Sequence, residues 1–181
     1  MTTPAASGIS AMFAQSLEVL SKPSVSTFER FEKRGTVTDA AIYVAITAAI
    51  AGVFGLANGL SGFLGGVIGT VISFFVFAGL VYYIGKSQGG TGTFDEVAYT
   101  FSLFWVPITV AVAVLTFLLV ITLIGILLLP LLAILAVIAE IWFGYMAVQS
   151  SMNLTQSNKI WTTLILAGLG SLIVNVVVLR L

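Results

Sequence analysis

The stretch from Ala40 to Gly85 contains no charged side chain. As a single helix it would be roughly 70 Å long at about 1.5 Å per residue, which is about twice the hydrocarbon thickness of a bilayer. The chain must therefore turn back once inside this stretch. Asn58-Gly59, followed by Ser61-Gly62, has the composition of a turn, because glycine accepts positive φ and Asn terminates helices.

The remaining sequence predicts three further crossings. Between Val97 and Asn158 the only charged residue is Glu140, and the helix breakers are Thr122, Gly125 and Pro130. With 59% hydrophobic and only 8% charged residues, the chain has the composition of a protein whose solvent is lipid. We therefore predict an all-α integral membrane helical bundle with five transmembrane helices. The predicted spans lie near 40–57, 62–84, 97–120, 130–151 and 160–179.

Residues 1–38 form a polar head that precedes the predicted membrane domain, 39–181. Apolar residues recur in the head at spacings of three and four, which is the pattern of a short amphipathic helix lying at the membrane interface. A solvated tail with chance periodicity is the alternative. The apolar positions are Ile9, Met12, Phe13, Leu17 and Leu20. Three pairs have the spacing of a helix-starting capping box: Ser26 with Glu29, Thr36 with Asp39, and Thr93 with Glu96.

Basic residues are unevenly distributed between the two sides that five spans would create. Only Arg180 falls on the side that carries the carboxyl terminus. The residues on the other side are Lys22, Arg30, Lys33, Arg34, Lys86 and Lys159. Because cytoplasmic loops carry an excess of Lys and Arg, we expect the amino terminus inside and the carboxyl terminus outside. We expect no cleavable signal peptide, since no basic residue precedes the first apolar patch.

Small residues line one face of each of the first two predicted spans. Runs of this kind let two helix backbones approach closely, so they predict a tight hairpin. A dimer face is the alternative interpretation, which leaves a homo-oligomer open. The seam consists of Gly52, Gly55, Gly59, Gly62, Gly66 and Gly69.

Polar groups inside the predicted spans are candidate functional residues. Glu140 lies about 15 Å from Pro130, near the middle of the bilayer, where acidic residues form hydrogen-bond anchors or coupling groups. Both interpretations stay open, with Asn175, Ser171, Tyr145, Thr100, Ser102, Thr109 or water as the candidate partners. Asn175 itself is expected to hold helices together. Pro107 removes a backbone hydrogen bond and is a candidate helix kink.

Several classes of function are disfavoured by what the sequence lacks. It contains no cysteine and no histidine, which removes disulfides, thiolate metal sites and imidazole-based catalysis. Its net charge is zero, without a dense basic run to follow phosphates. We therefore expect no enzyme activity, no cofactor, no metal site and no nucleic-acid partner, and we expect the lipid bilayer as the main environment.

The sequence resembles the Yip domain family of small polytopic membrane proteins, prokaryotic branch. The resemblance rests on Pro23 and Phe28 in the head, on the glycine-rich segment Gly89-Gly90-Thr91-Gly92-Thr93-Phe94-Asp95-Glu96, and on Tyr99, Ser102 and Pro107 at the start of the third span. It implies a five-span fold in a prokaryotic plasma (inner) membrane. Eukaryotic relatives are named for binding Rab-type small GTPases and take part in vesicle traffic. Thr100-Phe101 stands where those relatives favour Gly-Tyr, so a GTPase partner is not carried over.

These observations lead to two hypotheses of function. The first is a non-enzymatic membrane adaptor or organiser that presents its head and its glycine-rich loop to membrane or cytosolic proteins. The candidate interaction residues of that loop are Gly89, Gly90, Gly92 and Phe94. The alternative is a small transporter or channel component that uses Glu140.

Overall fold

The computed structural model describes residues 8–122 and 125–178, and within these ranges the chain is helical and contains no strand. Seven α-helices follow one another in the described residues: α1 (Ile9–Ser21), α2 (Val25–Phe31), α3 (Val37–Gly55), α4 (Gly59–Ser87), α5 (Phe94–Ile121), α6 (Leu129–Ser151) and α7 (Ser157–Val178). Two short 3-10 turns join them, η1 (Leu56–Asn58) before α4 and η2 (Gly125–Leu128) before α6.

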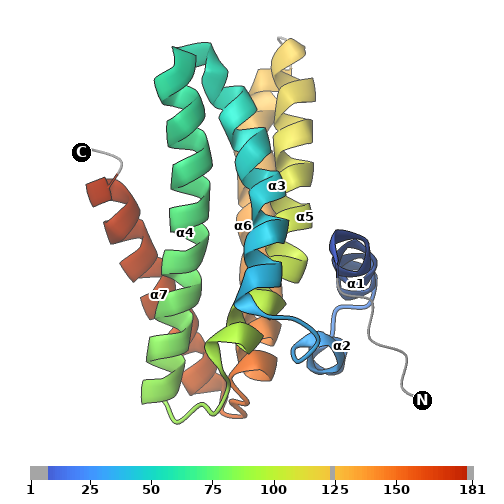
Figure 1. Cartoon of the computed structure of the whole chain (residues 1–181), viewed down its shortest axis with the longest axis vertical. Coiled ribbons are helices and arrows are strands. Elements are labelled where there is room, and N and C mark those ends of the chain that lie inside the picture. The colour runs from blue at the N-terminus through green and yellow to red at the C-terminus, as the bar shows by residue number, and fades with distance from the viewer. Residues whose placement is uncertain (1–7, 123–124, 179–181) are drawn as a thin grey trace.

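The long helices α3 to α7 stand side by side, and α1 and α2 lie against one flank of this bundle (Figure 1). Helix α3 packs against α4 and α5, α4 packs against α7, and α5 packs against α6. Within the described residues, four stretches are long and apolar enough to cross a membrane: Val37–Ser87, Phe94–Ile121, Gly125–Ser151 and Ser157–Val177. Large apolar side chains cover much of the outer surface, as a lipid environment requires. The protein is thus an integral membrane protein made of helices.

The first of these stretches reverses its direction at η1 and Gly59 (Figure 1). Gly59 has a φ of 76°, which side chains other than glycine rarely adopt. A Cβ at Gly55 would collide with the carbonyl of Gly62, and one at Gly66 would come within 2.5 Å of the Ala51 carbonyl oxygen. The backbones of α3 and α4 therefore approach each other directly, without side chains between them.

The junction between α5 and α6 was the least clearly marked in the sequence. Residues 123–124 lie outside the described residues. Helix α5 ends at Ile121, and α6 begins at Leu129, so that Pro130 occupies the first turn, where its missing N–H leaves no bond unmade. At the other end of the bundle α7 begins at Ser157, three residues before the predicted span. Arg180 lies outside the described residues.

Two of the three predicted capping boxes are confirmed. Thr36 with Asp39 starts α3, and Thr93 with Glu96 starts α5. The third prediction was wrong: α2 is capped by Ser24, whose side chain accepts a hydrogen bond from the Thr27 N–H. Ser24 has an extended backbone and comes directly after Pro23, so the helix starts two residues earlier than the Ser26 pattern indicated.

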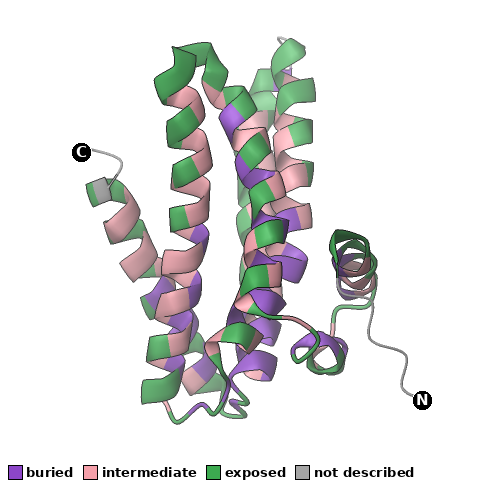
Figure 2. Ribbon diagram, viewed as in Figure 1, coloured by how far each residue is buried: buried purple, intermediate pink, exposed green. Residues whose placement is uncertain are grey.

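Charged side chains gather at one end of the bundle, which we call the polar end. It is the end at which α3, α5 and α7 begin and α4 and α6 end, together with α2, the 88–93 loop and the 152–156 turn (Figure 1). Among the described residues, every charged residue except Glu140 belongs to the polar end, to α1 or to the α1–α2 connection. Buried residues are also concentrated toward this end, whereas the half near η1 and η2 is mostly exposed (Figure 2).

Candidate functional site

Glu32 is the only fully buried acid of the described residues, with 4% of its surface exposed. It follows the last turn of α2 and accepts a hydrogen bond from the Ser150 hydroxyl at the end of α6. Lys33 Nζ lies 3.9 Å from Glu32 Oε1. Burial raises the pKa of Glu32 above its usual 4.5, and the Ser150 hydrogen bond partly opposes this shift. Since a buried carboxyl group is costly unless it is paired, Ser150 fixes where α2 can sit on α6.

An aromatic contact anchors the same helix to α5. Phe28 is fully buried, and its ring meets that of Phe104 in α5 edge-on, with centroids 6.1 Å apart. Phe104 in turn stacks on Phe143 in α6 at 5.7 Å. Helix α2 is therefore anchored to both α5 and α6.

Helix α1 is fastened to the bundle by two hydrogen bonds. The Tyr99 hydroxyl donates to Gln15 Oε1 at 2.8 Å, and the hydroxyls of Ser16 and Tyr43 lie 3.0 Å apart. The apolar pattern of the head divides into two faces. Met12 is buried against the bundle with Leu20 partly buried beside it, whereas Ile9, Phe13 and Leu17 are about half exposed.

The glycine-rich loop packs closely against the turn that follows α6. A Cβ at Gly92 would collide with the Ser151 carbonyl, and the Thr91 N–H donates to the Met152 carbonyl at 3.0 Å. Of the candidate interaction residues, Gly90 and Gly92 are buried, Gly89 is exposed with a φ of 92°, and Phe94 is half-buried against the ring of Tyr82. The buried glycines shape the loop, and its exposed residues are Gly89, Thr91 and Thr93.

Basic side chains are displayed around this assembly. The side chain of Lys33 is 70% exposed and that of Arg30 49%. Arg30 pairs with Glu18 at 2.5 Å, which ties α2 to α1, and the guanidinium groups of Arg30 and Arg34 lie over the Phe31 ring. Exposed ion pairs contribute little to stability, so the Arg30–Glu18 pair adds little to the anchoring of α2.

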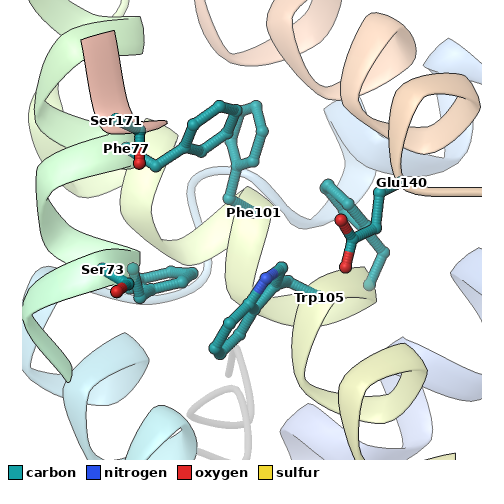
Figure 3. A pocket seen from close by; sticks show the side chains of 8 residues that line it. Ser73, Phe77, Phe101, Trp105, Glu140 and Ser171 are labelled. Atoms are coloured by element: carbon teal, nitrogen blue, oxygen red, sulfur yellow. The ribbon is translucent and has the colours of Figure 1, made fainter. Parts of the chain in front are cut away.

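Glu140 lies away from the polar end, on the wall of a cavity of about 210 Å³ inside the bundle (Figure 3). We call this space the Glu140 cavity, and it is bounded by α4, α5, α6 and α7. The carboxyl group points toward the space between Phe101 and Trp105. The residues that line the cavity are Ser73, Phe74, Phe77, Phe101, Phe104, Trp105, Glu140 and Ser171.

The structure does not pair Glu140 with the partners that the sequence suggested. Asn175 accepts a hydrogen bond from Ser73 and donates to Ser171, at 2.8 Å to its carbonyl and 3.3 Å to its hydroxyl. Tyr145 donates to Ser157 instead. Within the described residues Glu140 makes neither a hydrogen bond nor an ion pair, and of its suggested partners only Ser171 lines the same cavity. Asn175 does not pair with Glu140, because its amide is already hydrogen-bonded to Ser73 and Ser171.

The remaining polar residues, Pro107 and Gly69 of the membrane helices do not line the Glu140 cavity. Pro107 lies within α5, which continues unbroken to Ile121, and it lines a groove between α1, α3 and α5. Ser102 donates to the Tyr99 carbonyl within its own helix. Gly69 lines a second cavity, of about 430 Å³, which shares Ser73 and Trp105 with the Glu140 cavity. In the described part of the chain, the buried hydroxyls of Thr47, Thr100 and Thr109 have no hydrogen-bond partner.

Sequence reasoning missed the role of Glu32. The sequence does not single this residue out, because its hydrogen-bond partner Ser150 lies 118 positions away. The available signal was the apolar pair Phe28 and Phe31 directly before it, which marks a helix face that must be buried and so draws its neighbour inward.

The sequence as a whole was compared with known proteins. A family model described as the Yip1 domain matches residues 17–178, which is most of the chain and includes both α2 and the Glu140 cavity. No curated protein and no solved structure matches the chain.

Proposed function

This chain belongs to the Yip1 domain family, and on that premise we propose that it is a non-enzymatic membrane adaptor or organiser. In this proposal the polar end presents a fixed surface of mixed charge, with exposed basic side chains, to membrane or cytosolic proteins. Membership of the family does not favour the alternative of a small transporter or channel component.

The observation that carries the proposal is the burial of Glu32 against Ser150. A solvated tail would leave this acid in water, where its charge costs nothing. Here the head is instead locked onto the helix ends, together with the 88–93 loop and the 152–156 turn, so that its exposed cations hold constant positions. A pre-organised surface loses less conformational entropy when a partner binds.

The proposed topology has five crossings, with α3 to α7 as the spans. The turn at Gly59 supports this, because a stretch that folds back on itself cannot cross only once. The basic residues of the polar end support a cytosolic position for this end. The amino terminus would then lie inside and the carboxyl terminus outside, in a plasma (inner) membrane, with residues 1–38 as the cytosolic head and α1 at the membrane interface.

Site-specific photo-crosslinking in native membranes tests the adaptor proposal. A photoreactive amino acid is placed at Lys33 or Gln88 of the polar end and, as the matched control, at Leu60 near the opposite end, where the side chain is 71% exposed. We expect a discrete protein adduct from the polar-end positions that is absent at Leu60 and is weakened by the charge reversals Arg30→Glu and Arg34→Glu. An adduct of twice the mass of the chain would identify a second copy as the partner. Equal adducts at both ends, or none at the polar end, would count against the proposal.

A further inference from the structure

The Glu140 cavity combines a carboxyl group with a wall of aromatic rings. Phe74 and Trp105 lie 5.1 Å apart between ring centroids, Phe101 and Phe104 lie 5.3 Å apart, and Phe77 and Phe101 lie 5.5 Å apart. Aromatic faces attract cations through the ring quadrupole, most strongly for Trp and where water is excluded. The cavity thus places a carboxyl group and several aromatic rings around the same space.

The two hydroxyls of the cavity differ, because Ser171 accepts from Asn175 and keeps its hydrogen, whereas Ser73 offers a ligand only acceptor lone pairs. Ser73 donates its only hydrogen to Asn175 Oδ1, so its oxygen keeps lone pairs but has no hydrogen left for a ligand. The amide of Asn175 donates to Ser171 and holds that residue in place. A ligand that satisfies both Ser73 and a Glu140 carboxylate must therefore bring several N–H or O–H donors, and a primary ammonium has three.

The composition of the lining argues against an inorganic cation. Hard cations such as Ca²⁺ and Mg²⁺ take about six or more oxygen ligands, whereas this cavity supplies one carboxyl group and two hydroxyls among five aromatic side chains. The described residues contain no group of three or more acidic, Cys or His side chains that could hold a metal ion. The rings instead match an apolar body attached to the ammonium group.

The size and depth of the cavity limit the ligand further. An engineered cavity of about 150 Å³ holds benzene, so about 210 Å³ accommodates one ring with a short ammonium arm. Glu140 lies about 16 Å along α6 from Leu129, near the middle of the helix. This depth favours a small molecule that partitions into the membrane over the head group of a bilayer lipid.

We propose that the Glu140 cavity is a binding site for a small lipophilic primary ammonium ion, held by an ion pair with Glu140, by a hydrogen bond to Ser73 and by the aromatic wall. This site lies apart from the adaptor surface at the polar end, and its test needs no protein partner.

The test uses the full chain in phosphatidylcholine nanodiscs, with 2-phenylethylammonium as the probe. Trp142→Phe and Trp161→Phe, both at exposed positions, leave Trp105 as the only tryptophan of the sequence, so that its fluorescence reports on the cavity. We expect a saturable fluorescence change. Glu140→Gln should weaken binding about tenfold or more, and Ser73→Ala a few-fold. The matched control Glu29→Gln, which removes an exposed acid at the polar end, should leave the affinity unchanged.

Two related probes separate this site from simple partitioning. The neutral 2-phenylethanol should bind about tenfold more weakly or worse, because it lacks the charge, and the trimethylated ammonium should also bind more weakly, because it lacks N–H donors. The proposal is overturned by a non-saturable signal, by equal affinity for 2-phenylethanol, or by an unchanged affinity of Glu140→Gln. If Glu140→Gln does not elute as a folded protein, Ser73→Ala and the neutral probe test the site instead. The proposal is then overturned if Ser73→Ala binds 2-phenylethylammonium as tightly as the native chain does and the native chain binds 2-phenylethanol equally tightly.

Discussion

The ring of Phe28 meets the ring of Phe104 nearly at a right angle, with an interplanar angle of 88°. Phe104 contacts several parts of the molecule, because it also stacks on Phe143 and lines the Glu140 cavity. The polar head and the interior of the membrane domain therefore share one side chain. Through Phe104, α2 is in direct packing contact with the wall of the cavity.

Removal of the Phe28 side chain is expected to release the head. Phe→Ala in a packed core costs about 3–5 kcal/mol, and Phe28 is fully buried. Phe28→Ala should lower the thermal unfolding midpoint in mild detergent and speed tryptic cleavage at Arg30 and Lys33. The control is Phe13→Ala in α1, whose side chain is 54% exposed and which should change neither measurement appreciably. Equal cleavage rates in the two variants would show that Phe28 does not hold α2.

The buried acid gives stability a defined pH dependence. The pKa of Glu32 is raised above its usual 4.5, chiefly by burial, with nearby Glu96 and Glu29 raising it and Lys33 lowering it. The folded state therefore holds the proton more tightly than the unfolded state does, and the contribution of Glu32 to stability declines as pH rises above about 4.5. Glu32→Gln keeps an acceptor for Ser150 and cannot ionise, so it should remove this decline.

The measurement is the unfolding midpoint of both proteins from pH 4 to pH 8. We expect the midpoint of Glu32→Gln relative to the native chain to increase with pH. Ser150→Ala leaves the acid without its hydrogen bond and should be less stable than the native chain near neutral pH. Parallel profiles for the native chain and Glu32→Gln would mean that Glu32 does not titrate differently in the folded state.

Features that depend on one short segment could be predicted from the sequence, whereas contacts between residues far apart in the chain, such as Glu32 with Ser150, could not. Thr36 with Asp39 closes a capping box within one helical turn, so its spacing was sufficient to predict it. Long helices lie at each predicted span for the same reason, because hydropathy and length act within one segment. The pairing of Glu32 with Ser150 depends instead on how α2 docks on α6, and no short pattern encodes that.

The sequence likewise indicated one residue of the Glu140 cavity but not the cavity itself. Glu140 stood out because it is the only charged residue in a long apolar stretch. The aromatic wall comes from two other helices, and it depends on how α4, α5 and α6 are rotated relative to one another. Asn175 bonds Ser73 of α4 and Ser171 of its own helix, and it makes no hydrogen bond to Glu140.

The glycines between α3 and α4 differ in how much space a side chain would have. A Cβ at Gly55 would collide with the carbonyl of Gly62, which cannot move aside as a side chain could, whereas a Cβ at Gly65 would meet nothing within 4 Å. Gly55→Ala should therefore destabilise the protein by about 1–3 kcal/mol. Gly65→Ala, the control, should be neutral or stabilising by up to about 1 kcal/mol, because alanine favours helix. Unfolding by SDS from mild detergent measures both, and equal effects would contradict the close approach.

The proposed five-span topology can be tested directly because the sequence contains no cysteine. Single substitutions Lys33→Cys, Ser87→Cys and Thr155→Cys place a thiol at the polar end, and Asn58→Cys and Thr122→Cys place one near the opposite end. In intact cells a membrane-impermeant maleimide should label Asn58→Cys and Thr122→Cys, whereas the three polar-end variants should react only after the cells are opened. Lys33→Cys and Ser87→Cys are the critical pair, since they lie on the same side only if Val37–Ser87 crosses twice. Labelling of this pair from opposite sides would reduce the chain to four crossings, and labelling of all three polar-end variants in intact cells would invert the orientation.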